Sequence, residues 1–236
     1  MIENLPAYTY MVFALAALAT VFCAYRASGF SKPVLFSITG WAILQGIIAS
    51  TGFYTEVPVR IALAVGPPLA FIVMISFLPG ARRYLSMLDL KTLTWLHAVR
   101  VPVELVLLWL YFDGLVPRAM TLQGYNFDIL AGLSAPFVAW LFLTKKLNRK
   151  WLIAWNLVGL GLLFAIVISS ILSAPTPIQQ LSFDQPNRAV LYFPFVWLPS
   201  VIVPLVLLAH VAALRQLMSP AEKKSARHQL EALRSA

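Results

Sequence analysis

The sequence predicts an all-α integral membrane protein: a bundle of seven transmembrane helices with the N-terminus outside and the C-terminus cytoplasmic. Composition is the first reason, because 60% of the 236 residues are hydrophobic and only 11% are charged, whereas about a quarter of a soluble domain is charged. The second reason is length, because about 20 apolar residues cross a bilayer. Five uncharged stretches reach that length: 4–25, 33–55, 61–81, 151–183 and 189–214.

Two further segments complete the count of seven. Residues 92–112 are interrupted only by Arg100 and Glu104. Residues 129–144 form the shortest candidate, with a rise of about 24 Å, and Asn126 or Asp128 is expected to cap it. The predicted spans are 8–26, 33–53, 60–79, 91–112, 127–144, 151–173 and 190–214. Interior prolines in the third, fourth, fifth and seventh spans predict backbone carbonyls without a helical donor, so four of the seven helices are expected to be interrupted.

The third reason concerns orientation and follows from the basic residues. With the N-terminus outside, 14 of the 18 lysines and arginines fall on the inner side, and only Arg60, Arg118 and Arg188 fall outside. Basic residues concentrate in cytoplasmic loops. The net charge of +9 is therefore interpreted as a topology signal and an attraction for anionic lipid headgroups on the cytoplasmic side, and no nucleic-acid partner is expected.

Two segments make up the predicted organisation. Residues 1–217 form the seven-helix domain, and residues 218–236 form a short cytosolic amphipathic tail that begins with the capping box Ser219-Pro220-Ala221-Glu222. No basic region precedes the first apolar stretch, so the first helix is expected to stay in the protein. Short loops without an Asn-x-Ser/Thr site favour the inner (cytoplasmic) membrane of a bacterium.

Three charged or titratable residues lie on one face of the fourth span. At 100° per residue, Arg100 and Glu104 lie within 60° and 20° of His97 around the helix axis. Counting from Lys91 at the inner boundary, Arg100 and Glu104 bracket the midplane at about 13 and 19 Å of depth. Charge at that depth needs a partner or water. The two residues could pair with each other at i, i+4 and merely fix helix packing, or they could face a polar cavity.

The leading functional hypothesis takes the second alternative. It is a small-solute or ion transporter, or a membrane ligand-binding protein, in which Arg100 contacts an anionic or dipolar group and Glu104 is its counter-charge or a protonatable group. Asp128 and Asp184 would guard the outer entrance. The second and sixth spans each combine a tryptophan, an amide and a glycine, as corresponding helices of a repeated carrier would, so Gln45 and Asn156 are further candidates for ligand binding.

Two alternatives remain open. His97 and His210 are predicted at similar depth on different helices, where they could ligate a b-type haem axially in electron transfer or haem sensing. Alternatively, the protein is an intramembrane enzyme acting on a lipid or small molecule. Zinc chemistry would need three ligands, whereas the spans offer two histidines, and no G-x-S-x-G, H-E-x-x-H or C-x-x-C motif occurs. Catalysis is therefore less favoured than transport or ligand binding.

One exclusion is specific. In size and topology the chain resembles the microbial rhodopsins, which bind retinal through a lysine in the last helix. Residues 189–214 contain no lysine. The resemblance is therefore one of topology alone and implies nothing about function.

Overall fold

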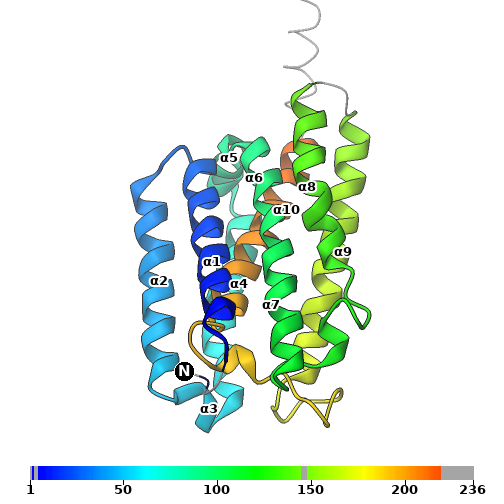
Figure 1. Cartoon of the computed structure of the whole chain (residues 1–236). Helices are drawn as coiled ribbons and strands as arrows, with labels where there is room; N and C mark the ends of the chain where they lie inside the picture. The colour runs from blue at the N-terminus through cyan, green and yellow to red at the C-terminus, as the bar shows by residue number, and fades with distance from the viewer. Residues whose placement is uncertain (1, 3–4, 145–147, 219–236) are drawn as a thin grey trace, which may run out of the picture.

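A computed structural model describes residues 2, 5–144 and 148–218 of the chain. Every regular element in this part of the chain is helical. The long helices stand side by side and roughly parallel, with the short helix α3 at one end of the bundle and the short helix α5 at the other (Figure 1).

The first half of the bundle contains three long apolar segments. Helices α1 and α2 are joined by a tight turn, and the 3₁₀ turn η1 continues directly into α4. Their bounds, with those of α3 and α5, are α1 Ala7–Ala27, α2 Lys32–Ser50, α3 Phe53–Glu56, η1 Pro58–Ile61, α4 Ala62–Phe77 and α5 Pro79–Met87.

The second half contains the interrupted helices. The fourth long segment is broken by a 3₁₀ turn, and the last begins with a π-helical turn. The bounds are α6 Leu90–Leu96, η2 His97–Val99, α7 Arg100–Phe112, η3 Arg118–Met120, α8 Asp128–Leu143, α9 Arg149–Ser173, η4 Ala189–Leu191, η5 Leu198–Ile202 and α10 Val203–Met218.

Six helices in the described residues are long and apolar enough to cross a membrane, and α8 is a shorter apolar helix. Two of the six form the centre of the bundle. In Leu90–Phe112 and Leu198–Met218, 61% and 56% of the most apolar window is buried, against 11 to 28% in the other four. A side chain on the fourth helix is therefore far more often enclosed by protein than one on α2.

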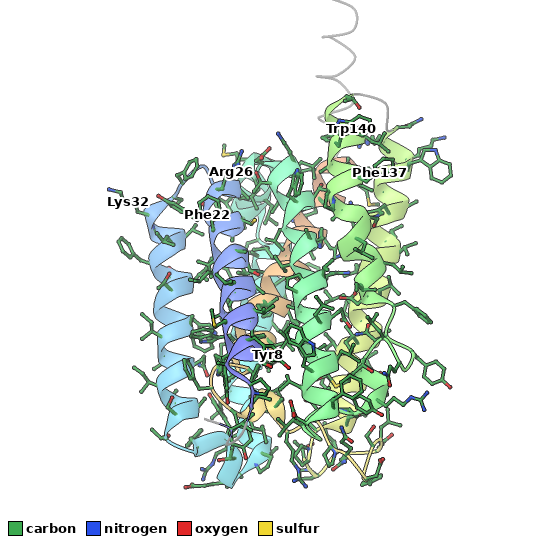
Figure 2. The ribbon with its side chains drawn as sticks, viewed as in Figure 1. Tyr8, Phe22, Arg26, Lys32, Phe137 and Trp140 are labelled. Carbon is green, nitrogen blue, oxygen red and sulfur yellow. The ribbon has the colours of Figure 1, made fainter. Side chains whose placement is uncertain are left out.

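The outer surface is apolar. On α1, Met11, Leu15, Leu18 and Phe22 follow one another at helical spacing, and each is more than half exposed. Figure 2 shows Phe22 of α1 and Phe137 and Trp140 of α8 on the outside of the bundle. A water-soluble helix would turn such a stripe inward. The arrangement is compatible with a helical membrane protein.

The start of the last helix differs from the sequence prediction. The last helix begins at Leu198, not at residue 190, because Val190, Leu191, Phe195 and Val196 are buried in irregular turns. Hydropathy reports burial in an apolar environment, and it does not distinguish a spanning helix from a buried turn. The predicted tail helix after residue 218 lies outside the described residues.

The prolines also act differently from the prediction. Breaks occur at His97–Val99, which ends three residues before Pro102, and at Leu198–Ile202, which contains Pro199. By contrast, α4 continues through Pro67 and Pro68, and α8 continues through Pro136. A proline removes one hydrogen bond of the ladder, and the turns on either side can keep helical dihedrals.

Candidate functional site

The fourth helix carries its polar face into the centre of the bundle. His97, Arg100 and Glu104 are 1%, 3% and 2% exposed. The sequence predicts that these residues share a face, and all three are buried because Leu90–Phe112 is the most enclosed helix. Buried charge is costly unless it is paired and hydrogen-bonded, so the partners of Arg100 and Glu104 define the site.

Arg100 joins three other helices. Its Nη1 donates to Oδ1 of Asp128 on α8 at 2.8 Å and to the carbonyl oxygen of Gly159 on α9 at 3.1 Å. Its Nη2 donates to Nε2 of His210 on α10 at 2.9 Å. Its Nε is buried and has no hydrogen-bond partner among the described residues. The guanidinium therefore ties α7, α8, α9 and α10 together at one point.

This arrangement changes two expectations. The ion-pair partner of Arg100 is Asp128, rather than Glu104 one turn along the same helix. Asp128 is itself 5% exposed and is not a guard at an entrance. The physical reason is the shortness of α8, which has 16 residues. Its first turn begins inside the bundle, so Asp128 reaches the guanidinium.

Glu104 is held by a different residue, Asn126. The Nδ2 of Asn126 donates to both carboxylate oxygens, at 2.6 and 2.7 Å, and to the carbonyl oxygen of Met120 at 3.0 Å. The Oδ1 of Asn126 accepts the backbone N–H of Asp128 at 3.0 Å. One amide thus fixes Glu104 and the start of α8 together. The sequence suggested only a capping role for Asn126.

The contacts of His210 fix its tautomer. A guanidinium can only donate, so Nε2 of His210 accepts from Arg100 and Nδ1 carries the proton. That proton is donated to Oδ1 of Asn156 at 3.0 Å, and Nδ2 of Asn156 donates to the carbonyl oxygen of Leu152 at 2.9 Å. His210 is therefore neutral in this network, and Asn156 orients the imidazole that contacts Arg100.

His97 lies directly against His210. Their ring centroids are 4.0 Å apart with the planes at 26°, and Trp155 meets His97 edge-on. Nδ1 of His97 is buried without a hydrogen-bond partner in the described part of the chain. The similar depth expected for the two histidines is thus matched by direct contact.

This contact does not fit a haem between the two residues. Axial ligands direct one ring nitrogen each at the iron from opposite faces of the porphyrin. Here the two imidazoles stack on each other, and both nitrogens of His210 are already hydrogen-bonded. Among the described residues, no three His, Cys, Asp or Glu side chains are grouped so that they could hold a metal ion.

Two glycines let the helices approach at Arg100. A Cβ on Gly159 would lie 2.8 Å from Cε1 of His210, and a Cβ on Gly132 of α8 would lie 2.9 Å from a methyl carbon of Val101 and 3.1 Å from Cβ of Arg100. Both positions require the absence of a side chain. The sequence places Gly159 in an apolar helix, but its role depends on the helix opposite.

A cavity of about 450 Å³ adjoins the cluster. Its wall is formed mainly by apolar side chains of α4, α7, α9, η5 and α10, and Arg100, Glu104 and Asp128 also line it. The helices α4 and α9 each pack on α10, and the cavity lies between them. The lining residues Gly66, Phe164 and Ile171 are exposed. The sequence could not predict this cavity, because its apolar lining residues come from separate elements and form no pattern along the chain.

Two predicted site residues lie elsewhere. Gln45 is buried on α2 and accepts the hydroxyl of Tyr54 at 2.5 Å, without contact to Arg100. Asp184 lines a separate cleft of about 570 Å³ formed by the loops after α7 and α9, with Tyr111 and Arg118. The structure therefore brings together His97, Arg100, Asp128, Asn156 and His210, links Glu104 to them through Asn126, and leaves Gln45 and Asp184 apart.

Comparison with known proteins gives one match. No curated protein and no solved structure matches the chain. A family model described as "Domain of unknown function (DUF8737)" matches residues 56–218. That region runs from the end of α3 to the end of α10 and contains every residue of the cluster around Arg100. With more than half of its length matched, the chain belongs to this family, Domain of unknown function (DUF8737).

Proposed function

We propose that this protein is a seven-helix protein of a bacterial cytoplasmic membrane, with its N-terminus outside, that binds a lipid-soluble ligand in its central cavity. The six long apolar helices and the shorter α8 supply the seven segments. Arg26 and Lys32 lie at the end of the bundle opposite Tyr8 (Figure 2). That end is the cytoplasmic one under the positive-inside rule.

The cavity of about 450 Å³ carries this proposal. Ligand pockets are typically concave and apolar, about 300–1,000 Å³ in volume, with a few convergent polar groups. Here the charged groups are Arg100, Glu104 and Asp128, the hydroxyl residues Ser170 and Thr176 also line the cavity, and the rest of the wall is apolar. A molecule with an apolar body and a polar end matches both parts. An inorganic ion or a sugar would leave most of the wall in contact with polar surface, at a cost in desolvation.

The position of the cavity supports entry from the bilayer. Gly66 on α4 and Phe164 and Ile171 on α9 line it and are exposed on the same apolar surface that faces lipid in this proposal. A lipid-soluble molecule concentrates in that phase. It would reach the polar cluster without crossing water.

A transporter for the same ligand is the second candidate. The observation that favours it is the position of the two helix breaks. The 3₁₀ turn His97–Val99 directly precedes Arg100, and the π turn Leu198–Ile202 contributes Leu198, Pro199 and Ile202 to the cavity wall. Irregular backbone in transporters is found where it lines a cavity. Movement of the ligand between leaflets of proteoliposomes would separate transport from binding alone.

Photolabelling tests the binding proposal. The probe is a long-chain alcohol with a diazirine on its tail, applied to the purified protein in nanodiscs. We expect crosslinks in the cavity segments 163–167 and 202–207. We also expect Gly66→Phe to reduce them, because a Cβ at Gly66 meets no atom within 4 Å and the added ring would occupy the mouth.

Gly40→Phe on α2 is the matched control. Gly40 is also exposed and has no neighbour within 4 Å of a built Cβ, but it does not line the cavity. It should leave the cavity crosslinks unchanged. Labelling confined to outward residues such as Ile43 and Ile47, in equal amounts in both variants, would refute the proposal.

A further inference from the structure

The charged residues that line the cavity carry an imbalance of formal charge. One guanidinium, that of Arg100, faces two carboxyl groups, those of Asp128 and Glu104. His210 adds no positive charge, because its contact with Arg100 requires a neutral ring. With both carboxyl groups ionised, this wall holds one negative charge in excess. An uncompensated charge in an apolar interior is expensive.

The excess lies where a ligand can reach it. Asp128 uses Oδ1 for Arg100, and its Oδ2 has no hydrogen-bond partner among the described residues. Glu104 is bound by the amide of Asn126, a neutral donor that leaves the charge of the carboxylate in place. Both groups line the cavity. They offer acceptors for hydrogen bonds and attract a cation.

Arg100, by contrast, is already largely engaged by the protein. Three of its five N–H groups donate to Asp128, Gly159 and His210. Its Nε is buried. A carboxylate or phosphate head would have to displace Asp128 and would also meet the charge of Glu104. The sequence-based expectation of an anionic group on Arg100 is therefore the less favourable arrangement.

Resting on the binding function proposed above, we infer that the ligand is a single-chain amphiphile with a protonated primary amine as its head. The ammonium group would lie between Glu104 and the free oxygen of Asp128, and the chain would occupy the apolar part of the cavity toward Phe164. Its three N–H donors suit carboxylate acceptors, and its charge cancels the excess.

Three probes that share one diazirine-bearing tail and differ in their polar head group test this inference in the wild-type protein. The probes are the diazirine-tailed alcohol used above, the corresponding primary amine and the corresponding carboxylic acid, at neutral pH in nanodiscs of zwitterionic lipid. We expect the amine to label the cavity segments with a half-saturating concentration about 10-fold lower than that of the alcohol, which corresponds to about 1.4 kcal/mol. The acid should label these segments least.

Glu104→Gln supplies the variant, and Glu56→Gln is its matched control. Glu56 is an exposed carboxylate that pairs with Arg60 at 3.9 Å and does not line the cavity. We expect Glu104→Gln to bring the ratio between alcohol and amine close to one, and Glu56→Gln to leave the ratio unchanged. Using the ratio removes any general effect of the variant on labelling.

The possible failures are distinguishable. If the alcohol labels the cavity and the amine has no advantage in the wild-type protein, the inference about the head is wrong and the binding function stands. If no probe labels segments 163–167 and 202–207, both are wrong. An ethanolamine phospholipid carries the same amine, so competition by that lipid and by an unlabelled long-chain amine identifies the source. An unchanged ratio in Glu104→Gln would remove Glu104 from the site.

Discussion

Replacing Gly159 by alanine tests the central helix contact most directly. A Cβ built there lies 2.8 Å from Cε1 and 3.2 Å from Nε2 of His210, so the imidazole must move. His210 cannot move freely, because Arg100 holds Nε2 at 2.9 Å and Asn156 holds Nδ1 at 3.0 Å. The added methyl group therefore strains two hydrogen bonds of the buried network.

Gly161→Ala isolates this strain from the general effect of alanine. Gly161 lies on the same helix, is exposed, and has no atom within 4 Å of a built Cβ. Both substitutions gain the helix propensity of alanine over glycine, about 1 kcal/mol, so this gain cancels in the comparison. Overpacking of a well-packed site costs about 1–3 kcal/mol. We expect Gly159→Ala to be less stable than Gly161→Ala by this amount.

Thermal unfolding of the purified variants in one detergent measures the difference. For a protein of this size, 1 kcal/mol shifts Tm by about 2–4 °C, so we expect Tm of Gly159→Ala to lie about 2–12 °C below that of Gly161→Ala. Equal melting temperatures in the two variants would refute the close contact between α9 and His210.

Two other predictions concern pairs of residues. Arg100→Met and Asp128→Leu should each destabilise the protein by about 3–5 kcal/mol, because each leaves the other charge buried without its partner, and the double variant should lose less than the sum; additive losses in denaturant unfolding would contradict the pairing. Tyr54 lies outside the spans, and burial raises the pKa of its hydroxyl, which donates to Gln45. Because the hydroxyl has a higher pKa in the folded than in the unfolded state, the free energy of unfolding should hold below pH about 10 and fall as the pH rises beyond it. Tyr54→Phe should reduce this fall. The same dependence of stability on pH in both proteins would argue against a buried hydroxyl.

Much of the fold follows from composition and spacing. Uncharged stretches of about 20 residues identify the long helices with bounds correct to a few residues for α1 and α9. The last helix is the exception, because the buried turns at 190–197 are as apolar as the helix that follows them. Periodicity along the fourth helix likewise places His97, Arg100 and Glu104 on one inward face.

The hydrogen-bond and ion-pair partners of Arg100 and Glu104 could not be predicted from spacing along the chain. Arg100 and Glu104 have the spacing of an ion pair, yet the structure pairs Arg100 with Asp128 and Glu104 with Asn126, residues 28 and 22 positions away. Spacing along one helix determines which residues are neighbours on that helix. It carries no information about how deep the first turn of α8 lies.

By itself, the sequence determined an apolar all-helical chain and a charged face in the middle of one helix, because both follow from local patterns of a single segment. Only the tertiary structure decided that Arg100 links four helices, that Gly159 makes room for His210, and that Arg100, Glu104 and Asp128 line a largely apolar cavity. Those features depend on the relative depth and rotation of different helices, which result from packing of the whole bundle.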